Sequence, residues 1–535
     1  MTPILTAAQM KSCDTYTIEE LGIPSRTLME RAAHCAVEVL TSRADLFPAG
    51  KVLLLCGGGN NGGDGFAMAR FLAVEHQREG AVVYTGRWTE SGKPDPDRMS
   101  PECRRQYELA VGAGVPVLPM SAMEAGLSGA TAVVDAVFGI GLDRSVEGEI
   151  AHLLTTVAES GLPVLAVDIP SGIHADTGAV MGVALPATMT VTMQALKAGL
   201  LLYPGADICG EAVVAELGIS LAPADRPWGH LADEALLCRV RPPRARRSHK
   251  GTYGRVCLLC GSEGMSGAAV LATRAALRSG AGLAETLTAP ANRQVLQTTV
   301  PEAIVTARTS AETVERALRN ADGAVMGCGL GTDEEARDAL RAALHAVSEH
   351  SRTPVVLDAD GLNLLAANPT LWDTPLLGSS CKNLVITPHP AEMSRLCGLS
   401  VGEILRNLPR VAADFARERG VTVVLKDAHT VIASPDGALY VCAAGNAGLA
   451  KGGSGDVLAG VIGALLTQNR HRLGQGITVA EVAAAGVYLH AAAADRAARD
   501  LGEYGLLATD VIERIPLVCK AFSDSRTKIE RICDR

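Results

Sequence analysis

The chain has 535 residues, more than one hydrophobic core usually serves, so two or more domains are expected. Hydrophobic residues make up 48% of the chain and charged residues 20%, proportions that are typical of a globular protein and exclude a disordered chain. The 49 basic and 58 acidic residues give a formal charge of −9, and no long basic run offers a phosphate-neutralising surface, so we expect no nucleic-acid partner.

The start of the chain has no basic stretch followed by an apolar run, so no signal peptide is predicted. Residues 177–196 are uncharged and long enough to cross a membrane, but they contain glycine, proline and several threonines, which favours buried strand and loop. The 14 cysteines are scattered, several in apolar runs, and are interpreted as reduced thiols. We therefore expect a cytoplasmic protein with small-molecule substrates, no membrane partner and a homo-oligomeric state.

Short Val/Leu-rich runs alternate with longer amphipathic stretches, which predicts parallel strands joined by crossover helices. In the first half the predicted strands are 52–56, 81–85, 132–135, 163–168, 190–193 and 212–215. In the second half they include 255–260, 324–327, 354–357, 384–386 and 422–425. Between the halves, residues 221–250 contain four prolines and a basic cluster without sustained periodicity, and we interpret them as a linker.

The first predicted strand runs into a glycine-rich loop, C-G-G-G-N-N-G-G-D-G at residues 56–65. Glycines 57, 59 and 62 match G-x-G-x-x-G, the pattern that places a pyrophosphate on helix N–H groups. The second strand is followed by Gly-Arg and lacks the acid that would bind a ribose, which disfavours an ordinary NAD oxidoreductase. Oxygen atoms of Asn60, Asn61 and Asp64 favour a cation beside a phosphate.

Two further strands end in acids followed by glycine loops, D-A-V-F-G-I-G-L from Asp135 and D-I-P-S-G from Asp168. The carboxyl ends of parallel strands line one sheet edge, so Asn61, Asp135, Asp168 and Ser171 are expected to converge. A single acid at such a position could merely cap a turn, but three sites in one sheet favour a functional role.

These motifs, with G-I-P-S and L-M-E near the start, resemble the N-terminal epimerase domain of NAD(P)H-hydrate repair enzymes over about residues 1–220. The resemblance implies a potassium ion held by Asn61, Asp135 and Ser171, a catalytic acid/base at Asp168, and a catalytic role for Lys197, which matches the lysine of the family's T-V-T-F segment. The segment before that lysine has Met193 where the family usually has phenylalanine. The hydrated dinucleotide would be bound by Asn60, Asn61, Gly62, Gly63, Asp64, Gly139, Ile140, Gly141, Leu142, Asp143, Arg144, Ser145 and Asp168.

In the second half, G-G-S-G-D at residues 452–456 precedes an apolar helix. Small residues at a helix N-terminus let several N–H groups point at one anion, so this loop is interpreted as an anion hole. Asp456 is either an N-terminal charge partner or a general base for phosphoryl transfer, and we favour the base. His389 lies between two prolines, and its rigid backbone favours contact with a ligand.

This half resembles the ADP/ATP-dependent dehydratase of the same repair system, a ribokinase-like enzyme, over about residues 240–520. The resemblance implies that Ala268, Gly331, His389 and Asp456 contact the hydrated dinucleotide. The adenine nucleotide, ADP or ATP, would contact Lys426, Asp427, Ala428, His429, Thr430 and Gly455, and phosphoryl transfer implies magnesium. Three positions depart from the family pattern: Asp427 replaces glycine, Cys328 replaces proline, and Lys451 replaces a small polar residue.

The sequence is therefore interpreted as an α/β protein with two three-layer αβα domains, an N-terminal Rossmann-like domain at 1–220 and a C-terminal ribokinase-like domain at 240–520. The expected function is repair of hydrated NADH or NADPH by epimerisation of the R and S hydrates and nucleotide-dependent dehydration of the S hydrate. The alternative is a vitamin-type small-alcohol kinase fused to a non-catalytic nucleotide-binding module, because the fold alone does not fix the substrate. The choices between ADP and ATP, and between NADH and NADPH, stay open.

Overall fold

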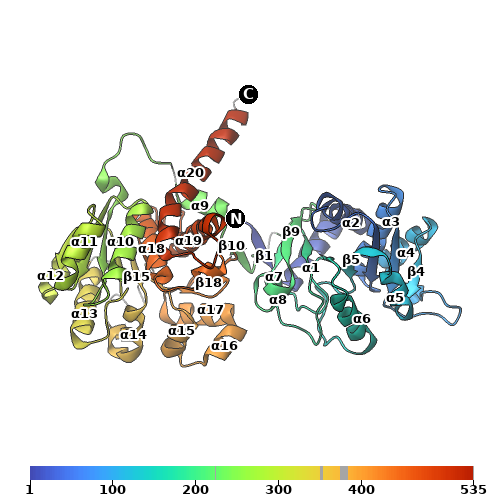
Figure 1. Cartoon of the computed structure of the whole chain (residues 1–535), viewed down its shortest axis with the longest axis horizontal. Coiled ribbons are helices and arrows are strands. Elements are labelled where there is room, and N and C mark those ends of the chain that lie inside the picture. The colour runs from blue at the N-terminus through green and yellow to red at the C-terminus, as the bar shows by residue number, and fades with distance from the viewer. Residues whose placement is uncertain (223–224, 242, 350–352, 374–382, 534–535) are drawn as a thin grey trace. The chain divides into compact units, whose positions relative to one another are not determined.

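The structure is a computed structural model that describes residues 1–535 except 223–224, 242, 350–352, 374–382 and 534–535 (Figure 1). The chain divides into two compact units, which we call the N-terminal unit (Pro3–Trp228) and the C-terminal unit (Met1–Thr2 with Gly229–Arg535). None of the described helices is long and apolar enough to cross a membrane.

The N-terminal unit contains a parallel sheet in the order β4-β3-β2-β5-β6-β7-β9. Its strands are β2 (Lys51–Cys56), β3 (Gly80–Tyr84), β4 (Val117–Pro119), β5 (Ala130–Ala136), β6 (Val164–Val167), β7 (Met189–Met193) and β9 (Glu211–Ala215). The direction of winding reverses between β2 and β5, as in doubly wound nucleotide-binding folds, whose ligands bind where the order reverses. The strands predicted for this half are confirmed, and β4 is an addition.

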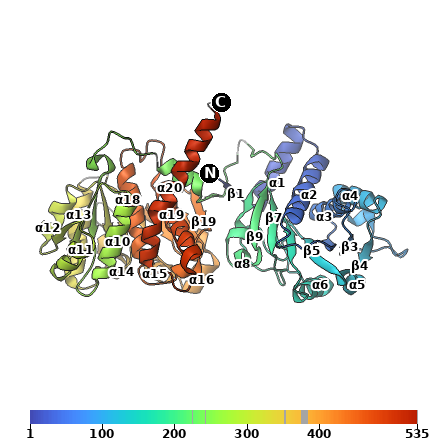
Figure 2. The same ribbon diagram turned by 45° about the horizontal axis from the view of Figure 1, so that its top comes forward.

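Helices cover both faces of this sheet, because alternate residues of each strand point to opposite faces. Leu54 of β2 packs in one core with α2 (Ser25–Ser42) and α3 (Asn60–Val74), whereas Leu53 and Leu55 pack in the other with α6 (Gly148–Glu159). Figure 2 shows β3, β4 and β5 between these helical layers, with α4 (Pro101–Gly112) beside α3 and α5 (Met123–Leu127) beside α6.

A short parallel pair lies apart from this sheet in the N-terminal unit. β1 (Pro3–Leu5) pairs with β8 (Leu196–Lys197), and Leu5 lies opposite Lys197. The chain then enters α1 (Ala7–Thr15), which continues as a π-helical turn (Tyr16–Glu20). The start of the chain is therefore held next to the lysine that the sequence analysis places in the active site.

The C-terminal unit contains strands in the order β13-β12-β11-β14-β15-β16-β17-β18-β19-β10. They are β10 (Gly229–Leu231), β11 (Arg255–Leu259), β12 (Leu283–Thr288), β13 (Ile304–Ala307), β14 (Gly323–Met326), β15 (Val355–Leu357), β16 (Leu384–Ile386), β17 (Thr422–Leu425), β18 (Thr430–Ala433) and β19 (Leu439–Cys442). Strands β13 to β17 are parallel, whereas β18 runs antiparallel to both of its neighbours. The strands predicted for this half are confirmed.

One helical layer of this unit consists of α9 (Glu234–Val240), α10 (Ser266–Arg278), α18 (Ser454–Asn469), α19 (Val479–Leu501) and α20 (Ala508–Cys533). On the other face, α17 (Leu408–Arg419) packs on β17 and β18. The remaining helices are α11 (Arg293–Thr299), α12 (Ala311–Leu318), α13 (Glu334–Ser348), α14 (Asp360–Ala367), α15 (Pro390–Cys397) and α16 (Val401–Arg406).

Part of the segment 221–250, interpreted from the sequence as a linker, is folded. Its residues form β10 and α9, and Leu236, Leu237 and Val240 are buried in the core of the C-terminal unit. Asp233 caps α9 by accepting a hydrogen bond from the backbone N–H of Leu236. A helix this short offers too few turns for its periodicity to be recognised among prolines and arginines.

Candidate active sites

The carboxyl ends of β2, β5 and β6 border a cavity of about 670 Å³ in the N-terminal unit, here called the N-site. Most residues that the sequence analysis assigns to the dinucleotide line it: Asn60, Asn61, Asp64, Gly139, Ile140, Gly141, Leu142, Asp143, Arg144 and Asp168, together with Lys197. Gly62 and Gly63 are instead buried in the first turn of α3, and Ser145 is exposed outside the lining.

The N-terminus of α3 faces this cavity with free backbone donors. Its N-cap residue, Gly59, has no side chain to accept a hydrogen bond, so the first N–H groups of the helix lack a capping partner. A Cβ atom at Gly62 would collide with the carbonyl oxygen of Gly57, so glycine is required for the loop to close. This arrangement suits the phosphates of a dinucleotide.

Asp168 and Lys197 form an ion pair in the wall of the N-site. The Lys197 ammonium is completely buried and donates to Oδ1 of Asp168 at 2.5 Å, to Oγ1 of Thr192 at 3.0 Å and to the carbonyl of Met193 at 2.7 Å. Asp168 has a φ of +70°, a left-handed conformation that aspartate tolerates better than most residues. Strained conformations of this kind are concentrated at functional sites, which agrees with the role expected for Asp168.

Asn61, Asp135 and Ser171 converge through a chain of hydrogen bonds. Ser171 donates its hydroxyl to Asp135 Oδ1 at 2.6 Å and its backbone N–H to Oδ2 at 2.7 Å. Its hydroxyl accepts from the N–H of Phe138 at 2.9 Å, and Asn61 donates to the carbonyl of Phe138 at 2.9 Å. Burial raises the pKa of the Asp135 carboxyl to about 6, although the hydrogen bonds from Ser171 oppose this shift.

Two further acids line the N-site, and sequence reasoning assigned no role to one of them. Asp64 projects from α3, and Asp14 from the last turn of α1. Burial, and next the charge of Asp168, raise the pKa of Asp14 to about 6, and the same causes raise that of Asp64 well above its ordinary value. A signal for Asp14 was present in the sequence, because this charged residue stands four residues from both Met10 and Ile18.

The second site lies at the N-terminus of α18 in the C-terminal unit. Its N-cap residue, Gly453, has a φ of +93° and no side chain that could cap the helix, so the N–H groups of Gly455 and Asp456 can bind an anion. Asp456 follows in the first helical turn. Burial raises its pKa to about 6, with a smaller contribution from Asp358, while a hydrogen bond from the thiol of Cys328 lowers it.

Lys426 connects this helix N-terminus to the ends of β15 and β16. Its ammonium donates to Asp358 Oδ1 at 2.9 Å and lies 3.9 Å from Glu392 Oε2. A Cβ atom at Gly455 would lie 3.5 Å from both Asp358 Oδ2 and Lys426 Nζ, so the glycine loop and the ion pair are adjacent. Lys426, Gly455 and Asp456 are thus brought together as expected, and Asp358 is added to them.

Ala268 lies in the first turn of α10, Gly331 in the loop after β14, and His389 at the N-cap of α15. Ala268 packs against the loop after β14, in which the N–H of Gly331 donates to Asp360 Oδ2 at 2.9 Å. His389 is half-exposed and caps α15, because its Nδ1 accepts the backbone N–H groups of Ala391 and Glu392 at 3.1 and 3.3 Å. This capping role was not predicted from the sequence.

The departures from the family pattern have different surroundings. Asp427 and Ala428 are exposed, whereas His429 and Thr430 are partly buried at the start of β18. Asp427 does not adopt a positive φ, so this backbone does not require glycine. Cys328 is buried and donates to Asp456, which a proline could not do. Lys451 is exposed and donates to the carbonyl of Tyr504 at 2.8 Å.

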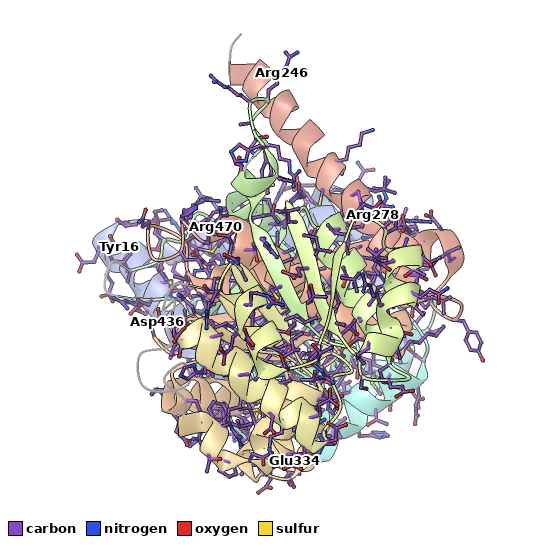
Figure 3. The ribbon with its side chains drawn as sticks, turned by 90° about the vertical axis from the view of Figure 1, so that its left-hand side faces the viewer. Tyr16, Arg246, Arg278, Glu334, Asp436 and Arg470 are labelled. Atoms are coloured by element: carbon purple, nitrogen blue, oxygen red, sulfur yellow. The ribbon has the colours of Figure 1, made fainter. Side chains whose placement is uncertain are left out.

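A second large cavity, of about 1070 Å³, lies in the C-terminal unit at the edge of the sheet opposite to the site around Asp456. Its lining includes Asp322, Asp436 and Arg470, and Figure 3 labels the last two on one side of this unit. None of the residues expected to bind substrate or nucleotide lines this cavity.

Each unit thus pairs a helix N-terminus that can bind phosphates with acids able to exchange protons, which defines an α/β enzyme with two nucleotide sites. Family models match both units: NAD(P)H-hydrate dehydratase over residues 256–517 and YjeF-related protein N-terminus over residues 25–199. The chain is 35% identical over 536 residues to the bifunctional NAD(P)H-hydrate repair enzyme Nnr of Moorella thermoacetica, covering 97% of this chain and 96% of that protein. It is 37% identical over 498 residues to the Nnr of Escherichia coli, covering 92% and 90%.

Solved structures similar to this chain match it over about half its length. A ribokinase-like superfamily protein from Enterococcus faecalis is 27% identical with a TM-score of 0.50, covering 56% of this chain and 99% of that one. An ADP/ATP-dependent NAD(P)H-hydrate dehydratase from Bacillus subtilis, co-crystallised with ATP and Mg²⁺, is 29% identical with a TM-score of 0.46, covering 55% and 99%. The chain belongs to the family of bifunctional NAD(P)H-hydrate repair enzymes, and its activities are NAD(P)H-hydrate epimerisation and ADP/ATP-dependent dehydration.

Proposed function

We propose that the N-site is the epimerase site and that Asp168 and Lys197 are its catalytic pair. The support is the 2.5 Å ion pair between Lys197 and Asp168 in the wall of the cavity that the N-terminus of α3 also borders. The dinucleotide phosphates bind the N–H groups of α3 and the loop after β5, which leaves the hydrated ring near Asp168. Asp168 then exchanges a proton with the oxygen on the hydrated carbon, while Lys197 holds the carboxylate in place.

Potassium is the cation we propose for Asn61, Asp135 and Ser171. These residues supply oxygen atoms, and Asp135 is a fully buried carboxylate with no cationic side chain among its hydrogen-bond partners in the described residues. A bound cation would supply the missing positive charge and fix the loop after β5. A crystal soaked with potassium and substrate is expected to hold an ion at these residues, and an ordered substrate without one would contradict this assignment.

In the C-terminal unit, we propose that Asp456 is the general base for phosphoryl transfer. The single observation that carries this role is its position in the first turn of α18, where a half-buried carboxylate lies beside free helix N–H groups. The carboxylate takes the proton of the ring hydroxyl while the hydroxyl oxygen attacks the terminal phosphoryl group of ADP or ATP. The ring nitrogen then expels phosphate, and loss of a proton from the adjacent carbon restores NAD(P)H.

We propose that Lys426, Thr430 and Gly455 hold the nucleotide phosphates, because the ammonium of Lys426 is adjacent to the glycine loop. Among the described residues, no cluster of three or more His, Cys, Asp or Glu side chains can hold a metal ion. Magnesium, which neutralises phosphate charge when bound, would therefore be held chiefly by the nucleotide itself.

The test is Asp456→Asn in the full-length chain, with dehydration of the S hydrate measured at saturating nucleotide. We expect turnover to fall about a hundredfold or more, with nucleotide affinity changed less than about threefold. Glu334→Gln is the matched control, because Glu334 (labelled in Figure 3) is an exposed acid in the first turn of α13. Near-normal turnover in the folded Asp456 variant would remove Asp456 from the mechanism.

A further inference from the structure

Asp14 reaches the N-site from the very start of the chain, along a path fixed by several contacts. β1 places Leu5 opposite Lys197, and α1 begins directly after it. Thr6 caps α1 by accepting from the N–H of Gln9 at 3.2 Å, and the N–H of Ala7 donates to Asp176 Oδ1 at 2.6 Å. The helix that carries Asp14 is therefore anchored beside the Asp168–Lys197 pair.

On the side of α1 that borders the cavity, Asp14 stands between two apolar residues, and the exposed Lys11 lies at the rim. Met10, Asp14 and Ile18 recur every four residues and all line the N-site. After Asp14 the helix widens into a π-helical turn, a feature frequent at functional sites. This turn is held in place because the Thr17 hydroxyl is buried and accepts from the N–H of Ser220 at 3.0 Å.

The Asp14 carboxyl has no hydrogen bond or ion pair with any residue in the part of the chain that the structure describes. A half-buried carboxyl without a partner lowers the stability of the folded chain. Packing therefore does not explain the presence of Asp14 on this helix face, whereas a function in the cavity does. The other charged groups that line the cavity are Asp64, Asp168 and Lys197, together with three exposed residues, Lys11, Asp143 and Arg144. The buried ammonium of Lys197 is already bound to Asp168.

Three carboxyl groups and a single buried ammonium cannot all be charged together at neutral pH. Asp168 is the carboxylate, because Lys197 donates to it directly. Burial, with a further contribution from the charge of Asp168, raises the pKa of the Asp64 carboxyl well above its ordinary value. Asp14, with a pKa raised to about 6, is the group that can both give and take a proton near neutrality.

We propose that Asp14 is the second proton-transfer group of the epimerase site, working on the opposite face of the hydrated ring from Asp168. This inference rests on the proposed assignment of the N-site as the epimerase site. When the carbon inverts by loss of the hydroxyl from one face and addition of water to the other, a proton-transfer group on each face serves one of the two steps. The unpaired Asp14 and the lysine-paired Asp168 supply one group each.

The proposed step balances without any co-reactant other than water. The Asp14 carboxyl gives its proton to the ring hydroxyl, the bond between carbon and oxygen breaks, and water leaves as the ring nitrogen's electron pair forms an iminium. A second water adds to the carbon from the other face and loses a proton to the Asp168 carboxylate. The two carboxyls restore their protonation through solvent water, and the reverse reaction exchanges their roles.

Asp14→Asn in the full-length enzyme tests this role, with interconversion of R and S hydrates followed directly. We expect kcat to fall about a hundredfold or more with KM within about threefold, and the pH profile of kcat to lose one limb. Glu19→Gln is the matched control, because Glu19 is an exposed acid on the π-helical turn that follows Asp14. Dehydration of pure S hydrate by the same chain is expected to be unchanged in both variants.

Chemical rescue of Asp14→Ala is a second measurement, and it would show no effect if the role of Asp14 were only structural. Added formate is expected to restore part of its epimerisation, because a small carboxylic acid can occupy the space that the side chain leaves. Absence of rescue, or a kcat within about threefold of wild type in Asp14→Asn, would overturn the role of Asp14. Failure of the wild-type chain to interconvert the hydrates would instead contradict the assignment of the N-site itself.

Discussion

Lys197 is expected to be the residue whose loss most clearly links stability and catalysis in the N-terminal unit. Its ammonium is completely buried, and all three of its hydrogen-bond acceptors lie within 3.0 Å. Lys197→Met keeps an unbranched apolar side chain but removes every donor. The Asp168 carboxylate, only 12% exposed, would then keep only the N–H of Met193 at 3.1 Å and the hydroxyl of Thr192 at 3.4 Å.

Removing one partner of a buried ion pair costs about 3–5 kcal/mol, because the other charge is left buried without compensation. We expect a loss of this size at neutral pH in the free energy of unfolding of the N-terminal unit. The double variant Lys197→Met/Asp168→Asn should recover more than half of the stability, because neither charge then remains.

Hydrogen exchange followed by mass spectrometry on peptides from β6 and β7, with urea as the perturbant, measures this unit by itself. Lys93→Met is the control, because Lys93 is exposed on the same unit and its replacement should change stability by less than about 0.5 kcal/mol. A Lys197→Met variant within about 1 kcal/mol of wild type at neutral pH would refute the reasoning. So would a double variant no more stable than the single one.

Two other predictions concern the C-terminal unit and the division of the chain. Cys328→Ala should move the acid limb of the dehydration pH profile to higher pH. The Cys328 thiol lowers the pKa of Asp456, and the carboxylate is the active form of that residue. An unchanged acid limb, measured at saturating substrates, would contradict this. Expressed separately, residues 1–228 should epimerise and residues 229–535 should dehydrate only the S hydrate, because each unit has its own core; two unfolded fragments by circular dichroism would show that the division is wrong.

The sequence by itself determined the class of fold, because short apolar runs at β2, β5, β6, β14 and β15 alternate with longer amphipathic stretches, as buried parallel strands joined by helices do. It also located both glycine loops, since glycine permits the close backbone approach at Gly62 and readily adopts the positive φ found at Gly453. The potassium and nucleotide roles came from the family resemblance. Strand β12 was not predicted, because its buried Glu285, paired with Arg255, interrupts the apolar pattern.

Only the tertiary structure decided which charged groups meet, because partners far apart in the sequence leave no local signal. Lys426 pairs with Asp358 across 68 residues, and Asp135 binds Ser171 across 36. Asp14 joins the N-site through the pairing of β1 with β8, which brings the start of the chain to Lys197. Local patterns fix strands, turns and caps, whereas burial and the distance between charges, which set protonation, exist only once the chain has folded.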